Sequence, residues 1–407
     1  MVQPVPDQPT EKKRSKRSKI ALKRIALVVF AAAIFILGLN IGSGRITFSN
    51  QTGVQKNLPN KLDYTSVNEL YRALKANFDG ELDTTKLTDG MKQGLVKAAG
   101  DPYTEYLSAA EYKDFNDQLS GSFTGIGAEL SQGSDGSIVI VSPIAGFPAE
   151  KAGLKPKDVI VEIDGTSTAG MTVSEAVQKI RGPKDSSVKL KIIRGSTPVE
   201  VTIVRQDISI PSVNSKVENG IGYLTISRFG EDTASLAKAA AEDFKQQNVK
   251  GVVVDVRSNP GGLLDAAVSV SSLWLPKGTT VLTERRDGLV TNTFKAEGGD
   301  VLKGIPTVVL IDGGSASASE ILAGALKDNG AASLVGEKSY GKGSVQQLIK
   351  LDGGGVLKVT IARWFTPGGK NIDKAGIEPD KKVTITPDDA KNGNDPQKSA
   401  ATQQLSQ

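Results

Sequence analysis

The stretch TVVLIDGGSASASEILAGALKDNG, residues 307–330, decides the fold of the C-terminal half of the chain. Its first residues are apolar and mostly β-branched, as expected of a short buried strand. Two glycines follow, which permit a tight turn, and the residues after the serines have the apolar spacing of a helix. The pattern predicts a strand, a glycine turn and a helix in succession.

Ser315, Ser317 and Ser319 stand where this turn meets the helix. The first backbone N–H groups of a helix have no intrahelical acceptor, so they are available to stabilise a developing oxyanion. A serine at this point is either a nucleophile or an N-cap, since serine is a preferred capping residue. The stretch lacks the final glycine of the Gly-x-Ser-x-Gly motif, which argues against the hydrolase fold that carries that motif. The local pattern leaves both roles open.

The chain of 407 residues contains no histidine and no cysteine. A Ser-His-Asp triad, a Cys-His pair and a zinc site built from His or Cys are therefore excluded within this chain. A hydrolase built from this sequence must use lysine, carboxylates, amides or the chain terminus. We expect no metal and no cofactor.

Two further glycine turns contain residues that a hydrolase without histidine or cysteine could use: backbone N–H donors in one and a lysine in the other. VRSNPGGLL, residues 256–264, places Gly261 and Gly262 after a strand, where their backbone N–H groups can approach a ligand closely. GEKSYGKGSVQQ, residues 336–347, places Lys342 between two glycines. A lysine acts as a base only when neutral, which requires burial or neighbouring cations to lower its pKa. Taken singly, each stretch is equally well explained as an ordinary turn.

The N-terminus has the pattern of a membrane anchor. Residues 1–24 contain eight Lys/Arg and two acidic residues, and the other residues contain 42 basic and 43 acidic side chains. The net charge of +5 therefore belongs to the tail, and we predict no nucleic-acid partner. Residues 25–44 contain no charge and as a helix would span about 30 Å, the thickness of a bilayer core. The positive flank predicts a cytoplasmic N-terminus, and a cleaved signal peptide is the alternative.

Changes in composition and periodicity divide the chain further. Short strands, one helix and a hairpin make a compact αβ module, and strands alternating with helices then predict a largely parallel sheet. The last residues are polar and have little to bury. We predict a basic tail at 1–24, a transmembrane helix at 25–44, a linker at 45–61, a helical region at 62–118, the αβ module at 119–206, a larger α/β domain at 207–386 and a disordered tail at 387–407.

Several motifs in one order resemble the carboxyl-terminal processing proteases, also called tail-specific proteases. The three glycine turns carry this resemblance, and DPYTEYL (101–107) and FTPGGKNIDKAGIEPD (365–380) are similar to the family's flanking signatures. The module at 119–206 resembles the family's embedded PDZ domain. The similarity covers residues 62–386 and implies a helical N-terminal region, a PDZ domain and an α/β protease core. Together with the transmembrane helix predicted above, the expected fold class is an α/β multidomain protein.

The resemblance implies a role for individual residues. Ser317 matches the nucleophile, Lys342 the general base and Gln346 the residue that supports this lysine. The N–H of Ala318 would be one oxyanion donor, and the turn at Gly261 and Gly262 would supply the other.

In the PDZ-like module, FTGIGAEL stands where such domains bind a carboxylate. The N–H groups of Gly125, Ile126 and Gly127 would hold a substrate's C-terminus while the peptide adds as a strand. The expected partners are protein or peptide substrates bound by their C-terminal tails, and the membrane through one helix. The expected location of the catalytic domain is extracytoplasmic. The sequence leaves homo-oligomerisation and the physiological substrates open.

Two other functions compete with this interpretation. A catalytically inactive PDZ scaffold would not need Ser317, Lys342 and Gln346, which are all present. A penicillin-recognising acyl-enzyme needs a lysine three residues after its serine and a later Lys-Thr-Gly segment, and Ser317 is followed by neither.

Overall fold

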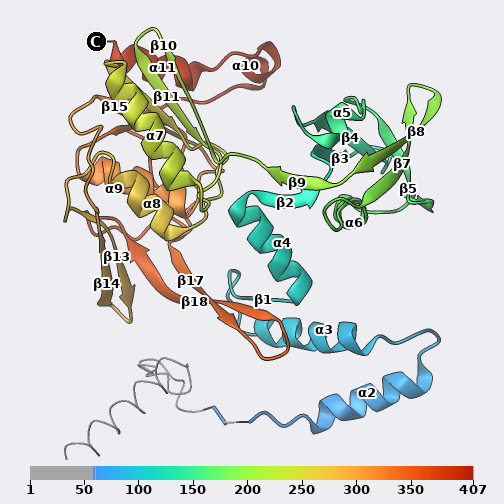
Figure 1. Ribbon diagram of the computed structural model, residues 1–407. Helices are drawn as coiled ribbons and strands as arrows, with labels where there is room; N and C mark the ends of the chain where they lie inside the picture. The colour runs from blue at the N-terminus through green and yellow to red at the C-terminus, as the bar shows by residue number, and fades with distance from the viewer. Residues whose placement is uncertain (1–57, 60, 407) are drawn as a thin grey trace, which may run out of the picture. The chain divides into compact units, whose positions relative to one another are not determined.

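The computed structural model describes residues 58–59 and 61–406 (Figure 1). The predicted basic tail, the predicted transmembrane helix at 25–44 and most of the linker lie outside the described residues. Among the helices that are described, none combines the length and the apolarity needed to cross a bilayer. The chain divides into two units, Met1–Leu82 and Asp83–Gln407.

The region predicted as helical, 62–118, contains three helices and one short strand among its described residues. Helix α2 belongs to the first unit and buries none of its residues. Helix α3 begins at Asp83, whose side chain accepts from two backbone N–H groups, and α4 begins at Ser108 with a capping box. The elements are α2 (Thr65–Asn77), α3 (Thr84–Lys97), β1 (Glu105–Leu107) and α4 (Ala109–Ser120).

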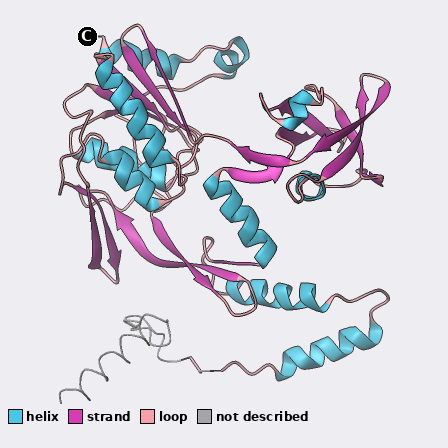
Figure 2. Ribbon diagram, viewed as in Figure 1, coloured by secondary structure: helices cyan, strands magenta, loops and turns pink. Residues whose placement is uncertain are grey.

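The αβ module is formed as predicted and is mainly strand (Figure 2). Its sheet has the order β3-β4-β5-β7-β8 with β6 on β5, so that β3 is an edge strand, and the predicted hairpin is β7–β8. Strands β2 and β9 pair with each other where the chain enters and leaves the module. The elements are β2 (Ser122–Gly125), β3 (Ala128–Gln132), β4 (Ile138–Pro143), α5 (Pro148–Lys151), β5 (Val159–Ile163), β6 (Thr166–Ser167), α6 (Val173–Ile180), β7 (Ser187–Arg194), β8 (Thr197–Val204) and β9 (Gln206–Ser209).

The larger domain is built on a sheet with the order β10-β11-β12-β15-β16-β19. All its neighbours are parallel except β10 and β11, which confirms the predicted parallel sheet. Strands β12 and β15 are apolar on both faces because both faces are covered. The elements are β10 (Val213–Glu218), β11 (Ile221–Ile226), α7 (Thr233–Gln246), β12 (Gly251–Asp255), α8 (Leu264–Ser271), β15 (Thr307–Ile311), α9 (Ala318–Asp328), β16 (Ser333–Gly336) and β19 (Lys381–Lys382).

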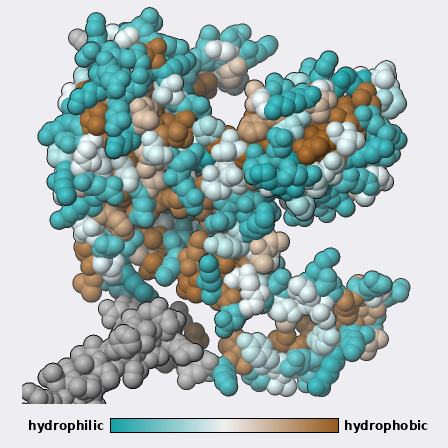
Figure 3. All heavy atoms as spheres, viewed as in Figure 1, coloured by the Kyte–Doolittle hydropathy of each residue, from teal (hydrophilic) through white to brown (hydrophobic). Residues whose placement is uncertain are grey.

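A second, antiparallel sheet has the order β1-β18-β13-β14, with β17 also paired to β18. It joins the segment around β1 to the strands that follow the Lys342 loop. Its remaining elements are β13 (Thr280–Arg286), β14 (Leu289–Lys295), β17 (Ser344–Lys350) and β18 (Val356–Phe365). Most of the surface visible in Figure 3 is hydrophilic, and apolar residues show through in small separate groups.

The prediction of a disordered tail at 387–407 is wrong. The chain forms α10 (Pro387–Asn392) and α11 (Pro396–Leu405). Ala400 and Ala401 are buried against Val253, Val308 and Leu310 of the parallel sheet, on the face opposite α7, α8 and α9. The tail is polar, but the sheet supplies most of the apolar surface, so two alanines are enough for close packing.

Candidate active site

The parallel sheet brings the three glycine turns together. Strands β12, β15 and β16 are neighbours, so the turns that follow them leave the same edge of the sheet. Such an edge, at the carboxyl ends of parallel strands, is where α/β domains place their ligands. The turns are residues 256–262, 312–317 and 337–343.

Of the three serines in the turn after β15, only Ser317 lines a cavity. Ser315 and Ser319 are fully buried. The Ser315 hydroxyl donates to the Val256 carbonyl at 2.8 Å, and the Ser319 hydroxyl donates to the Asn259 carbonyl at 2.9 Å. Ser317 is half-buried and lines the cavity at the sheet edge. The flanking serines hold the turn together, and Ser317 is the one left for chemistry.

The backbone of Ser317 is held in an unusual conformation. Its φ is 55°, which is uncommon for a residue with a side chain and which functional sites often retain. Its N–H donates to Glu320 Oε2 at 2.9 Å. Ala318 is the first residue of α9, so its N–H has no intrahelical acceptor.

The turn at Gly261 and Gly262 packs directly on this serine. A Cβ at Gly261 would lie 2.7 Å from Ser317 Cβ and 2.9 Å from the Ala318 nitrogen, so only glycine fits. The Gly261 N–H donates to Asn259 Oδ1 at 2.9 Å. No acceptor for the Gly262 N–H lies within the part of the chain that the structure describes. Of the two glycines, Gly262 is therefore the one whose N–H is available to bind a ligand.

Lys342 lines the same cavity, but its amine is not hydrogen-bonded to Ser317 in the described structure. The Nζ atom lies 5.4 Å from the centre of the Tyr103 ring, a cation–π contact. Burial lowers the pKa of Lys342, and the nearby Lys358 ammonium lowers the pKa further. Both effects favour the neutral amine that a base requires.

Gln346 also lines the cavity, near the start of β17. Its amide nitrogen donates to Ser344 Oγ at 2.8 Å and to Thr360 Oγ1 at 3.4 Å, and not to Lys342. The structure thus brings Ser317, Lys342 and Gln346 to one cavity without joining them by hydrogen bonds.

Glu320 is a site residue that sequence reasoning missed. It is fully buried. It accepts hydrogen bonds from the N–H groups of Ser317, Gly341 and Lys342 and from the Ser339 hydroxyl. One carboxylate therefore links the turn at Ser317 to the loop that carries Lys342. The signal for it was its place three residues after Ser317, the position of the glutamate in a capping box.

Tyr103 and Lys358 were missed as well. Tyr103 lies in DPYTEYL, a segment whose resemblance to the family implied no role for it, and Thr104 of that segment accepts a hydrogen bond from the Thr360 N–H of β18 at 3.1 Å. Lys358 lies on β18 and pairs with Glu105 of β1 at 2.6 Å. Lys358 lines the cavity and Tyr103 contacts Lys342, and the antiparallel sheet that brings them there has a pairing that the sequence did not reveal.

The cavity is otherwise lined mainly by apolar side chains. They surround the serine and offer a surface for an apolar substrate side chain. They are Phe115, Leu119, Leu263, Leu264, Ile321, Val345, Leu348 and Trp364.

In the αβ module, the predicted carboxylate loop lies directly before the edge strand β3. Gly125 ends β2, and Ile126 and Gly127 connect it to β3. Within the described residues, no acceptor is bonded to the N–H of Ile126 or Gly127. Helix α6 packs against β3. A free strand edge next to a helix, with unbonded N–H groups at one end, suits a peptide that adds as a strand.

Comparison with known proteins identifies the family of the chain. The sequence model of Peptidase family S41 matches residues 220–383, and that of the PDZ domain matches residues 118–193. The chain is 38% identical over 369 residues to the carboxy-terminal processing protease CtpA of Bacillus subtilis (strain 168), covering 90% of this chain and 76% of the relative. It is 36% identical over 374 residues to a probable CtpA-like serine protease of Staphylococcus haemolyticus, covering 90% and 75%.

A solved structure is also similar. The photosystem II D1 C-terminal processing protease matches with a TM-score of 0.50 and 30% identity, covering 80% of this chain and 89% of that one. The two family models match most of the larger domain and of the αβ module, and both relatives carry the names of CtpA-type proteases. The chain belongs to peptidase family S41 and is a C-terminal processing serine protease with a PDZ domain.

Proposed function

We propose that this protease cleaves its substrates with a Ser317–Lys342 dyad through an acyl-enzyme. The observation that carries the proposal is that Ser317, alone among the three serines of its turn, lines the cavity that also contains Lys342. The pKa of Lys342 is lowered by burial and by Lys358, which supports its role as a base.

In the proposed mechanism, neutral Lys342 Nζ takes the proton of Ser317 Oγ as this oxygen attacks the scissile carbonyl carbon. The N–H groups of Ala318 and Gly262 hold the oxyanion that forms. The C–N bond then breaks, and the lysine ammonium gives its proton to the leaving amine. Water attacks the acyl-enzyme with Lys342 again as base, which releases the acid and restores Ser317 Oγ–H.

The proposed mechanism requires Lys342 to leave the Tyr103 ring and reach Ser317. The contact with the ring favours the protonated amine. Gln346 would likewise leave Ser344 and bond to the lysine amine. We assign the observed arrangement to a resting enzyme, and substrate in the cavity would favour the paired one.

Substrate selection is assigned to the PDZ domain. We propose that the N–H groups around Gly125, Ile126 and Gly127 bind the C-terminal carboxylate of a substrate and that its chain pairs with the edge of β3. The apolar lining of the cavity favours apolar side chains at the scissile bond.

We further propose that residues 25–44 anchor the enzyme in the membrane with residues 1–24 in the cytoplasm and the catalytic domain outside it. This rests on the uncharged stretch and its positive flank. Protease added to intact cells should remove the bulk of the chain and leave residues 1–24 protected. A soluble form beginning near Gly44 would show instead that the segment is a cleaved signal peptide.

The proposed nucleophile is tested with the full chain purified in detergent. Wild type and Ser317→Ala are compared on unfolded β-casein and on an internally quenched peptide with a free C-terminus. We expect cleavage by wild type only, with equal melting temperatures. Cleavage by Ser317→Ala at a rate near that of wild type would refute the assignment.

A further inference from the structure

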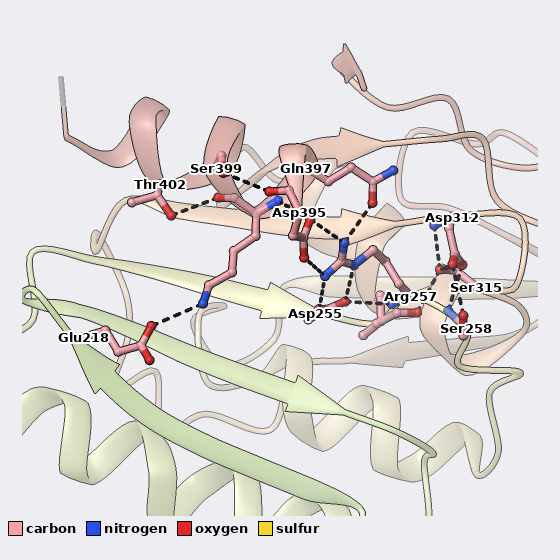
Figure 4. A network of polar contacts seen from close by, with 12 residues as sticks. Glu218, Asp255, Arg257, Ser258, Asp312, Ser315, Asp395, Gln397, Ser399 and Thr402 are labelled. Atoms are coloured by element: carbon pink, nitrogen blue, oxygen red, sulfur yellow. Dashed lines mark hydrogen bonds and ion pairs between the residues drawn. The ribbon is translucent and has the colours of Figure 1, made fainter. Parts of the chain in front are cut away.

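Arg257 links the turn of the active site to the C-terminal helix. It lies two residues after β12 and four residues before Gly261. Its guanidinium donates to both carboxylate oxygens of Asp255, at 2.9 and 2.6 Å, and to both of Asp395, at 3.0 and 2.8 Å. Figure 4 shows the guanidinium between these two carboxylates, with Gln397 as a further acceptor at 3.0 Å.

The acceptors from the tail are themselves well fixed. Asp395 is the N-cap of α11 and accepts from the Lys398 N–H at 2.9 Å. Gln397 is buried, and its amide nitrogen donates to the Val383 carbonyl at 2.7 Å. The start of α11 is therefore a rigid support for Arg257, and such paired, charge-assisted hydrogen bonds have a defined geometry.

The residue after Arg257 is strained and is held from the other side. Ser258 has a φ of 54°. Its N–H donates to Asp312 Oδ1 at 2.8 Å and its hydroxyl to Asp312 Oδ2 at 3.2 Å, as Figure 4 shows. Asp312 begins the turn that leads to Ser317. A strained residue keeps its conformation only where its surroundings hold it, and here Arg257 and Asp312 flank it.

We propose that α11 positions an oxyanion donor of the active site. Asp395 at the start of α11 holds Arg257, and Arg257 in turn holds the 258–262 turn in the position from which Gly262 donates to the oxyanion. Arg257 and Asp395 are positioning residues in this account. The inference rests on the proposed function, in which Gly262 supplies the second oxyanion donor.

The chain offers a matched control for this role. Lys398 of α11 also pairs with Glu218 of β10 at 3.2 Å, and among the described residues neither side chain forms a hydrogen bond or ion pair with the 258–262 turn. Ala400 and Ala401 keep the helix packed on the sheet independently of either ion pair. Loss of the Lys398–Glu218 pair should weaken only the attachment of α11 to the sheet. Loss of the Arg257–Asp395 pair should weaken the same attachment and also free the Arg257 side chain.

The experiment compares wild type, Asp395→Asn, Asp395→Glu and Glu218→Gln as full-length protein in detergent. The readouts are kcat and KM on an internally quenched peptide with a free C-terminus, the labelling rate of Ser317 by a fluorophosphonate, and the melting temperature. Removing an oxyanion donor costs about 10²–10³ in kcat. A displaced donor should cost at least about tenfold, so Asp395→Asn should lower kcat and labelling by that factor with KM within about twofold.

Glu218→Gln should leave kcat and KM within about twofold of wild type, and Asp395→Glu, which keeps the charge, should recover most of kcat. Equal kcat for Asp395→Asn and Glu218→Gln would overturn the inference, as would a loss that appears only in KM. If Asp395→Asn does not fold, Gln397→Ala replaces it, and a kcat equal to that of Glu218→Gln would again overturn the inference. Activity in Ser317→Ala would instead refute the proposed function.

Discussion

Replacing Glu320 by glutamine should misalign the lysine loop. The carboxylate of Glu320 uses both oxygens as acceptors: Oε1 accepts from Ser339 Oγ at 2.6 Å and the Gly341 N–H at 2.8 Å, and Oε2 accepts from the Ser317 and Lys342 N–H groups, each at 2.9 Å. Glutamine has one acceptor oxygen and one NH₂ group. Its NH₂ group must therefore face donors on one side.

The geometry decides which orientation costs less. With the NH₂ group at the Oε2 position, two backbone N–H groups lose their acceptor. With it at the Oε1 position, only the Gly341 N–H does, because the Ser339 hydroxyl can turn and accept. One buried bond to a charged group is then lost, worth about 1.5–3 kcal/mol. We expect Glu320→Gln to lower the free energy of unfolding by about that amount.

The same change should lower activity, since Gly341 precedes Lys342. A misplacement near 1 Å in a catalytic group can cost about a hundredfold, so we expect kcat/KM to fall at least about tenfold. Thermal unfolding and peptide cleavage measure the two effects. Glu378→Gln, which removes an exposed carboxylate paired with Lys338, is the control and should change neither. Wild-type melting temperature and kcat/KM in Glu320→Gln would refute the idea that this carboxylate aligns the site.

Three other changes test the lysine and the PDZ domain. Lys342→Arg should abolish turnover with folding preserved, because a guanidinium does not deprotonate at usable pH. In the wild-type enzyme the pKa of Lys342 lies below its usual value. The kcat/KM of wild type should therefore rise with pH through that lowered pKa and show no separate rise near pH 6.5. Tyr103→Leu should remove the contact that favours protonated Lys342 and move this rise about 0.4–0.7 pH units lower, whereas Tyr103→Phe keeps the ring and should not; identical profiles for all three would exclude the contact as a determinant. C-terminal amidation of a peptide removes the charge that residues 125–127 are proposed to bind and should lower kcat/KM about ten- to a hundredfold, so equal rates for acid and amide would contradict tail recognition.

The sequence predicted most of the fold because its strongest signals are local. The segments at 307–311 and 251–255 are apolar runs that are followed by glycine-containing turns, and the structure has β15 and β12 there. The parallel sheet then places their turns at one edge. The same local reasoning does not reveal which of several N–H donors in a turn is free. The sequence therefore could not distinguish Gly261 from Gly262 as the second oxyanion donor, whereas the structure shows that the Gly261 N–H is already bonded to Asn259.

Residues that act through distant partners were beyond such reasoning. Lys358 reaches the cavity and Tyr103 reaches Lys342 because β1 pairs with β18, a contact between segments about 250 residues apart. A composition rule treats each segment as if it were alone, and this is why the tail at 387–407 was predicted to be disordered. The tail needs little apolar surface of its own, since Val253, Val308 and Leu310 already present a flat apolar face. Asp395 and Gln397, which counted toward disorder, are the residues that bind Arg257. Whether such a polar segment is ordered therefore depends more on a charged partner at the sheet edge, here Arg257, than on the hydropathy of the segment itself.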